Sequence, residues 1–289
     1  MVTIDPTSFG PVKAWKLGSN VFGKPQMFVY CFLIDGLLVD TGQARAEQAF
    51  LQALESEPID QIVLTHHHED HSGNVEAIKK AKSIPAYGSS LCCEKMTIPF
   101  RVDFGRWMTW GSFKTADIKP FESDVIETSQ YRFEIIPTPG HAIDQVSLYE
   151  SNEGWLFSGD IFVHDYIKMF MRDEMIGDQI HSIRRLLELD FSKMFCNHQP
   201  VMSDPKSRLR NKLNFLEDFY GKVAEQYNKG LSVKQIMKTL NYKDNRFMSL
   251  ISWGEMSKSN MVRSVIRTVE QGILKSCLLY TSPSPRDRG

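Results

Sequence analysis

The sequence predicts a mixed α/β fold in which two sheets pack together, helices lie outside them, and a helical extension follows at the C-terminal end. Three observations lead to this prediction. Short apolar runs separated by turns dominate the first half, strand and helix patterns then alternate up to about residue 200, and only helix patterns follow from about residue 205. A chain of 289 residues is long enough for one large domain with an appendage.

Strands are expected where short apolar runs are bounded by turn residues: 27–35, 37–40, 59–65, 131–138, 145–150, 154–160 and 193–197. The first two runs meet at Gly36, which is typical of a hairpin. Ile62, Val63 and Leu64 are apolar without interruption, and this favours a strand that is covered on both faces.

Helices are expected where apolar residues recur at helical spacing: 44–55, 75–82, 178–189 and the segments after residue 205. Asn74 and Asp178 are positioned to cap the helices that they precede. Ser232 and Gln235 have the spacing of a capping box. Residues 89–120 are less regular and rich in aromatic side chains.

The charges divide the chain into an acidic body and a basic end. Residues 1–204 hold 18 basic and 28 acidic side chains, whereas residues 205–275 hold 14 basic and 6 acidic side chains. We therefore expect a catalytic domain at 1–204 and a basic helical extension at 205–276. The basic charge indicates either an anionic partner or substrate, or simple docking of the extension on the acidic body.

The cysteines and the two ends of the chain indicate the compartment. Five cysteines without disulfide-like spacing fit a reducing environment, so we expect a cytoplasmic protein. The first ten residues, MVTIDPTSFG, do not resemble an export signal, and no apolar stretch of about 18 residues indicates a membrane span. The final residues, 277–289, resemble translated vector or adapter sequence, so we expect a non-native tail and a missing natural C-terminus.

The segment 65–74, THHHEDHSGN, concentrates residues that bind metals. In an extended segment His66, His68 and Asp70 lie on one side, because side chains alternate along such a segment. His71 then turns to the other side as a helix begins. The segment can therefore supply two adjacent metal ions, His66 and His68 for the first and Asp70 and His71 for the second. His67 and Glu69 are expected to point elsewhere.

The remaining ligands are expected at the ends of other strands. Three short motifs end with a suitable side chain and directly follow an expected strand: Pro139-Gly140-His141, Ser158-Gly159-Asp160 and Cys196-Asn197-His198. Glycine lets the backbone turn sharply beside a bound ion. An earlier Asp40-Thr41-Gly42 also ends a strand.

HHHEDH followed by PGH, SGD and NH in this order resembles the metallo-β-lactamase superfamily over residues 13 to 200. The resemblance implies an αβ/βα four-layer sandwich with a two-metal site at one edge of the sheets. It implies metal one on His66, His68 and His141, metal two on Asp70, His71 and His198, and Asp160 between them. It also implies that Asp40 supports the site from behind the ligands. Asn197 departs from the pattern, because related hydrolases often have glycine there.

A two-metal site of this kind predicts hydrolysis by a metal-bridging hydroxide, and Asp70 can also accept the proton of the attacking water. Two zinc ions are expected, and iron or manganese also fits such ligands. No cysteine nucleophile is needed, so Cys92 and Cys93 are expected to be incidental. His164 and His181 are expected to be ordinary residues, although His164 is close enough to Asp160 in sequence to reach the pocket.

Two segments, 100–113 and 161–177, fall where the family places loops over the metals. Their apolar residues suit an acyl group, and their polar side chains suit an anionic end of the substrate: Arg101, Arg106, Tyr166, Lys168 and Arg172. The alternative is that these segments only pack against each other or against the extension. The leading hypothesis is a thioester hydrolase similar to the glyoxalase II group, with a small acyl substrate as partner.

A metal-dependent nuclease is the alternative hypothesis, because basic helices suit phosphate contacts. Residues 230–265 resemble a small winged-helix-like module. Only under this alternative is nucleic acid a partner, and no membrane partner is expected. An iron-containing oxygen reductase and an exported β-lactamase are not expected, since the chain has neither a flavin-binding stretch nor an export signal. The sequence predicts no oligomeric state.

Overall fold

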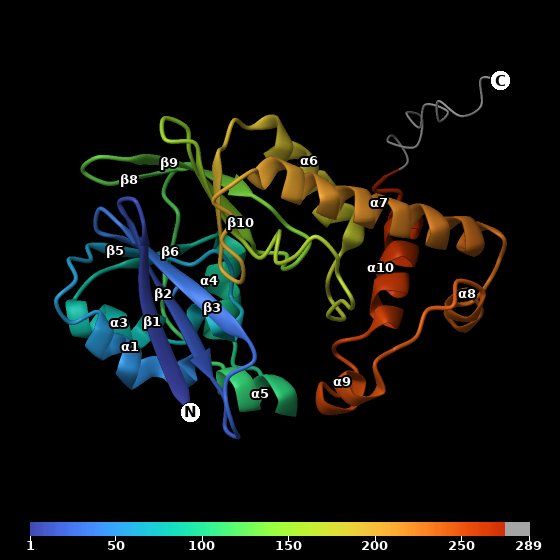
Figure 1. Ribbon diagram of the computed structural model, residues 1–289, viewed down its shortest axis with the longest axis horizontal. Coiled ribbons are helices and arrows are strands. Elements are labelled where there is room, and N and C mark those ends of the chain that lie inside the picture. The colour runs from blue at the N-terminus through green and yellow to red at the C-terminus, as the bar shows by residue number, and fades with distance from the viewer. Residues whose placement is uncertain (275–289) are drawn as a thin grey trace.

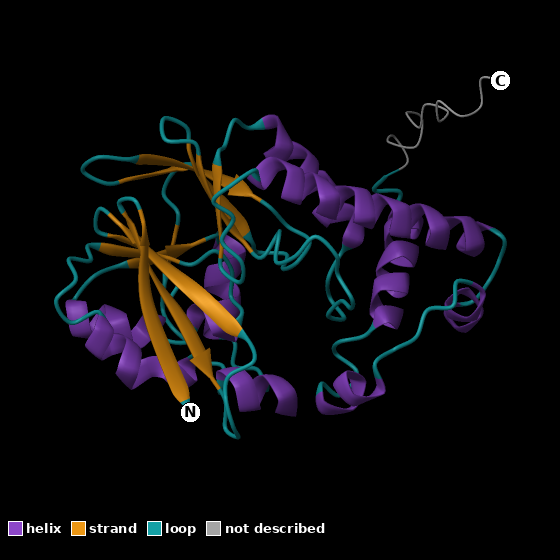
Figure 2. Cartoon of the chain, viewed as in Figure 1, coloured by secondary structure: helices purple, strands orange, loops and turns teal. Residues whose placement is uncertain are grey.

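The computed structural model describes residues 1–274 of the chain (Figure 1). They form two sheets that pack face to face, with helices on the outer face of each sheet (Figure 2). This architecture confirms the mixed α/β fold that the order of elements predicts.

The first sheet has seven strands in the order β1-β2-β3-β4-β5-β6-β7. Strands β1 to β4 pair antiparallel, whereas β4 to β7 pair parallel. The bounds are β1 Val2–Phe9, β2 Val12–Ser19, β3 Phe28–Ile34, β4 Leu37–Val39, β5 Gln61–Val63, β6 Ala86–Gly88 and β7 Lys119–Pro120.

The second sheet has five strands in the order β12-β11-β10-β9-β8. Its strands pair antiparallel except for β11 and β12, which are parallel. The bounds are β8 Val125–Glu127, β9 Arg132–Pro137, β10 Val146–Glu150, β11 Trp155–Gly159 and β12 Lys193–Cys196.

The helices lie in two groups on the outside of this pair of sheets, and in the latter part of the chain they form the extension (Figure 1). Their bounds are η1 Ala44–Ala46, α1 Glu47–Ala53, α2 Glu69–Ser72, α3 Val75–Lys82, α4 Ser90–Thr97, α5 Phe104–Trp110, α6 Ile176–Glu188, α7 Pro205–Asn228, α8 Val233–Thr239, α9 Arg246–Ile251 and α10 Lys258–Gln271.

Three buried apolar clusters alternate with the sheets and define four layers. The middle cluster lies between the sheets and joins Phe32 of the first to Phe157 of the second. A second cluster joins the outer face of the first sheet to α1, α3 and α4, and a third joins the second sheet to α6, α7 and α10. The layers therefore follow the order αβ/βα.

The packing on both faces of β5 explains why its sequence is apolar without interruption. Val63 faces the middle cluster, whereas Ile62 and the adjacent Leu64 face the outer cluster beneath the helices. All three side chains are fully buried. This confirms the prediction of a strand covered on both faces, and it fixes the position of the histidine segment that follows.

The helices from Pro205 onward have no separate core. Leu209 of α7 and Val265 of α10 share one cluster with Ile180 of α6. Helix α9 lies beside α5, where Ile251 approaches Gly105. The helical extension therefore packs against the second sheet and against α5, and its treatment as a separate domain stays a prediction.

Two predicted helix caps are wrong. Asn74 occupies the cap position of α3, but its side-chain oxygen accepts no hydrogen bond from the start of the helix, and its amide group donates to the Thr41 carbonyl at 2.7 Å. Helix α6 already begins at Ile176, two residues before Asp178. The Ile176 N–H instead donates to Ser264 Oγ of α10 at 2.8 Å. Long-range contacts have replaced the local caps in both places.

Other local features follow the sequence or add to it. The capping box of α8 is confirmed, because the Ser232 N–H donates to Gln235 Oε1 at 2.9 Å. The hairpin of β3 and β4 turns at Gly36, whose φ of +80° suits glycine. The β1–β2 hairpin forms the outer edge of the first sheet and had no sequence prediction.

Within residues 1–274 no helix combines the length and apolarity that crossing a bilayer requires. Four cysteines are free thiols in this part of the chain: Cys31, Cys92, Cys93 and Cys196. Cys277 and the expected non-native tail, 277–289, lie outside the described residues.

Candidate metal centre

The polar side chains singled out by the sequence follow strands that end at one edge of the two sheets. Asp40 follows β4 and His66 follows β5, and these strands are parallel. His141, Asp160 and His198 follow β9, β11 and β12, which run in the same direction in the second sheet. Parallel strands have their carboxyl ends at the same edge of a sheet, so the loops that follow these strands lie close together.

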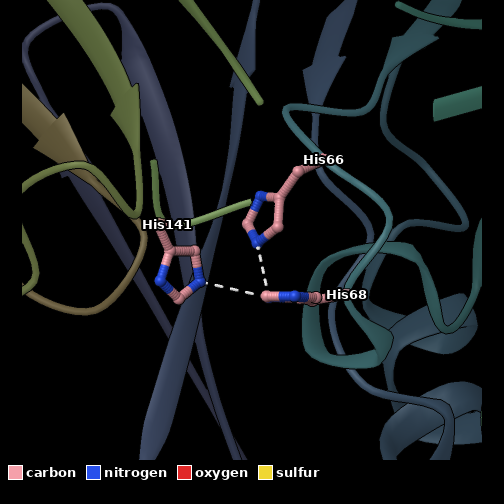
Figure 3. Close-up of side chains that lie close together, drawn as sticks. All are labelled: His66, His68 and His141. Atoms are coloured by element: carbon pink, nitrogen blue, oxygen red, sulfur yellow. Dashed lines mark hydrogen bonds between the residues drawn. The ribbon is translucent and has the colours of Figure 1, made fainter. Parts of the chain in front are cut away.

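His66, His68 and His141 form the first group of nitrogen donors. His66 Nε2 lies 3.1 Å from His68 Nδ1, which lies 3.1 Å from His141 Nε2 (Figure 3). The three ring nitrogens point toward one common position, and all lie within 4.8 Å of one another. This is the set expected for metal one.

Asp70, His71 and His198 form the second group. Asp70 Oδ2 lies 3.4 Å from His198 Nε2 and 3.9 Å from His71 Nε2. The backbone conformation at Asp70 differs from the prediction, because the extended segment ends at His68 and helix α2 begins at Glu69. The expectation that Asp70 continues the strand-like alternation is therefore wrong, although the expected set comes together.

Asp160 lies between the two groups. Its Oδ2 atom is 3.0 Å from His198 Nε2, 3.4 Å from His71 Nε2 and 3.6 Å from His141 Nε2. One carboxylate oxygen thus approaches nitrogens of both groups. A glycine precedes it with φ +52°, a conformation that few other residues adopt, and turns the chain at the end of β11.

The unused hydrogen-bonding capacity of these side chains fits bound metal ions. His71 Nε2 and Asp160 Oδ1 are buried and have no hydrogen-bond partner within the described residues. Buried polar atoms rarely remain unpaired without a ligand, water or ion. Imidazole and carboxylate donors converging in this number suit zinc and related divalent metals.

Asp40 organises the back of the second group. Its Oδ2 atom accepts hydrogen bonds at 2.8 Å from Thr65 Oγ1, His71 Nδ1 and Asn197 Nδ2, and its Oδ1 accepts from the Thr65 N–H. The carboxylate therefore orients His71 with Nε2 toward the ligand position. The departure at Asn197 is accommodated, because its amide also donates to the Tyr30 carbonyl at 2.8 Å.

The electrostatics divide the histidines into two kinds. Burial and neighbouring imidazoles lower the pKa of His66 well below its usual value, and the same causes act on the pKa of His68. For His71 and His198 burial opposes the charged form, but Asp160 and Asp70 outweigh it and raise each pKa well above normal. Neutral imidazole is the form that binds a metal, so metal binding at the second group would release protons.

Several supporting residues were not singled out from the sequence. Glu174 Oε2 lies 3.5 Å from His141 Nδ1, and the Phe28 carbonyl lies 2.7 Å from His198 Nδ1. His67 points away from the metal groups toward Asp144, whose two carboxylate oxygens lie 2.8 Å from its N–H and its Nδ1. No motif marks these partners, because they come from distant parts of the chain.

The segment 100–113 packs beside the metal groups. Arg106 forms a two-point ion pair with the buried Glu69, so this arginine is not available for a substrate. Phe100 lies 6.0 Å from the ring of His67, and Trp110 lies 6.3 Å from the ring of His198.

The segment 161–177 packs against the extension. Phe170 pairs with Ser257 through backbone hydrogen bonds, and Arg172 forms an ion pair with Glu255. Tyr166 and Lys168 are exposed. The packing alternative therefore holds for much of this segment.

His164 and His181 lie on the surface, as expected of ordinary residues. His164 Nδ1 accepts a hydrogen bond from the Tyr166 N–H. Neither residue belongs to the groups of metal donors found among the described residues. Cys92 is fully buried and Cys93 partly buried.

A four-layer αβ/βα sandwich with histidine and carboxylate donors at one edge defines a class of metal-dependent enzymes. The family model described as the metallo-β-lactamase superfamily matches residues 25–198, more than half of the chain. The chain therefore belongs to the metallo-β-lactamase superfamily, and it is a metal-dependent hydrolase of that superfamily.

Its relatives include two proteins named hydroxyacylglutathione hydrolase. The one from Ectopseudomonas mendocina is 28% identical over 243 residues, covering 83% of this chain and 79% of the relative. The one from Legionella pneumophila (strain Lens) is 30% identical over 192 residues, covering 65% of this chain and 67% of the relative.

Solved structures show the same fold at low identity. A metallo-β-lactamase from Pontibacter korlensis has a TM-score of 0.58 and 19% identity, covering 74% of this chain and 99% of that protein. A flavo di-iron protein mutant from Thermotoga maritima has a TM-score of 0.55 and 14% identity, covering 80% and 72%. These similarities concern the fold.

Proposed function

We propose that the chain is a two-metal hydrolase that cleaves a thioester or a related acyl ester. The observation that carries this proposal is the position of Asp160 Oδ2, within 3.0 to 3.6 Å of nitrogens from both donor groups. The proposed ligands are His66, His68 and His141 for one metal and Asp70, His71 and His198 for the other, with Asp160 between them and Asp40 as support.

Zinc is the proposed metal, since histidine and carboxylate ligands suit it, and metal analysis distinguishes it from iron or manganese. Two such ions, when bound, supply an activated water and polarise the substrate carbonyl. Asp70 is proposed to accept the proton of that water. Burial opposes its charge, but the neighbouring His71 and His198 lower its pKa, which favours the carboxylate form.

The relatives support thioester cleavage. Both are named for hydrolysis of an acylated glutathione, and the first alignment spans 83% of this chain. The chain departs from the family pattern at Asn197 and in the segment after Asp160. We therefore propose the thioester bond as the substrate class and leave the thiol unspecified.

Aromatic side chains support an apolar acyl group. Phe100 contacts the ring of His67, and the next residue, Arg101, lies 5.6 Å from the ring of Trp253. Phe100 and Trp253 are 36% and 54% exposed, so exposed apolar side chains adjoin Arg101. No carboxylate among the described residues pairs with Arg101, so it is proposed to bind an anionic end of the substrate.

The nuclease alternative has less support from the extension. Several of its cations are already paired with acidic residues: Lys206 with Asp190, Arg208 with Asp165, Lys222 with Asp218 and Lys229 with Glu225. The described segment 230–265 contains helices and no strand, so it lacks the β-wing of a winged-helix module. Lysine and arginine side chains bind phosphates by displacing the counterions of the nucleic acid, and they can do so only where they are not already paired with acidic residues.

The test compares substrates that differ in one bond. Purified protein is assayed with an anionic aromatic-acyl thioester, its oxyester analogue and bis-p-nitrophenyl phosphate, alongside metal analysis. We expect two metals per chain and a preference for the thioester. Turnover of the phosphodiester alone would contradict the proposal and favour a nuclease.

Arg101→Gln tests the substrate contact. The variant should raise KM for the anionic thioester, and for an uncharged analogue it should leave KM close to that of the unaltered protein. Arg132→Gln is the matched control, because Arg132 begins β9 and lies at the strand end opposite the metal groups. Equal effects of both substitutions on KM would argue against Arg101 as the anion-binding residue.

A further inference from the structure

Lys212 of α7 is a buried cation that the proposed chemistry does not use. Its residue is 2% exposed, and Nζ donates to the Ile161 carbonyl at 2.7 Å. Burial lowers the pKa of this side chain to about 8. An ammonium group is unfavourable in such a place, and an apolar side chain would fill the same space more stably if packing were the only requirement.

The carbonyl that Lys212 contacts belongs to the residue directly after Asp160. The turn around it is strained, because Val163 has φ +51°. A β-branched residue rarely adopts this conformation, and it persists only where neighbouring groups hold it. The position of the Asp160 carboxylate therefore depends on what fixes this turn.

A second cation on the same face of α7 holds the same turn. Arg208 lies one helical turn before Lys212, so both side chains project from one face of the helix. Arg208 Nε lies 2.8 Å from Asp165 Oδ1, and the guanidinium lies 5.6 Å from the ring of Phe162. Lys212 and Arg208, on consecutive turns of α7, thus contact the two ends of the segment 161–165.

We propose that Lys212 and Arg208 are positioning residues through which the extension holds Asp160 between the two donor groups. The proposal rests on the proposed two-metal function. The proposal gives α7 a role in the site, although α7 contains none of the proposed ligands and begins seven positions after His198, the last of them. Partners behind a metal ligand typically change metal affinity or activity by about 10–100-fold when removed.

Lys212→Met is the first test, because methionine fills a similar apolar volume without the ammonium. Arg210→Met is the matched control: this cation is exposed on the same helix and lies between the two positioning residues. We measure thermal unfolding, zinc affinity, the visible spectrum of the cobalt-loaded protein, and kcat and KM for the thioester.

We expect Lys212→Met to unfold at the same temperature as the unaltered protein or higher. Its zinc affinity or kcat should fall by about 10–100-fold, with an altered cobalt spectrum and an unchanged KM. In the metal-free protein, the backbone amides of residues 161–165 should exchange hydrogen faster. Arg210→Met should match the unaltered protein in every measurement.

Arg208→Gln keeps the test decisive if Lys212→Met does not fold, since Arg208 is partly exposed. It should shift the same readouts in the same direction, and Asp165→Asn should reproduce its effect without adding to it. Unchanged exchange, cobalt spectrum and kcat in the folded variants would overturn the inference. Failure of the unaltered protein to bind two metals would instead overturn the proposed function.

Discussion

Asp40→Asn tests the support of the metal centre by one atomic change. The carboxylate is fully buried and accepts four hydrogen bonds, three of them at Oδ2. Asparagine at this position has one oxygen and one amide group that donates. Whichever way the amide points, at least one donor of Thr65, His71 or Asn197 then faces another donor.

The expected loss can be worked from these contacts. In the less damaging orientation the new amide group replaces Oδ1 and faces only the Thr65 N–H. One hydrogen bond to a charged acceptor is lost, which costs about 1.5–3 kcal/mol of unfolding free energy. His71 also loses its charged partner, so we expect zinc affinity to fall by about 10–100-fold.

Chemical denaturation of the metal-free variant and zinc titration with a competing chelator measure the two effects. Asp35→Asn is the matched control, because Asp35 also accepts several hydrogen bonds but is partly exposed and lies at the hairpin turn between β3 and β4. The control should retain full zinc affinity. Wild-type stability together with wild-type zinc affinity in Asp40→Asn would refute the role assigned to this carboxylate.

Three further outcomes are expected. Arg106→Met leaves Glu69 buried without its partner, so denaturation should show a loss of about 3–5 kcal/mol; a loss below about 1 kcal/mol would contradict a buried pair. Because the pKa of Lys212 falls from 10.5 to about 8 on folding, the unfolded chain holds this proton more tightly, and unfolding free energy should rise by up to about 3 kcal/mol between pH 8 and 10.5. Lys212→Met should lack that part of the rise. Identical pH profiles of the variant and the unaltered protein would contradict a contribution of Lys212 to the rise. Phe157→Ala removes a ring stacked on Phe195 in the middle cluster and should cost about 3–5 kcal/mol in denaturation; a cost near that of a surface substitution would contradict the packing described.

The donor groups could be predicted from the sequence because their residues directly follow strand patterns. His141, Asp160 and His198 each come within a few residues of an apolar run. Parallel strand directions then bring these loops to one edge. The order of elements was likewise enough to predict two sheets with helices outside them.

Partners set by packing between distant segments could not be predicted. Lys212 and Ile161 are 51 residues apart, and His67 and Asp144 are 77 residues apart. Arg106 looked available for a substrate, but the fold places it against Glu69. Local patterns report helices and strands, and they carry no information on which charged side chains meet across layers.

The number of metal ions per chain tests the central claim most directly. Protein loaded with excess zinc, dialysed, and analysed by mass spectrometry should contain two zinc ions per chain. The double variant His66→Ala, His68→Ala should retain one, held by the second donor group. Fewer than two ions in the unaltered protein, or an equal content in the double variant, would contradict the two-metal centre.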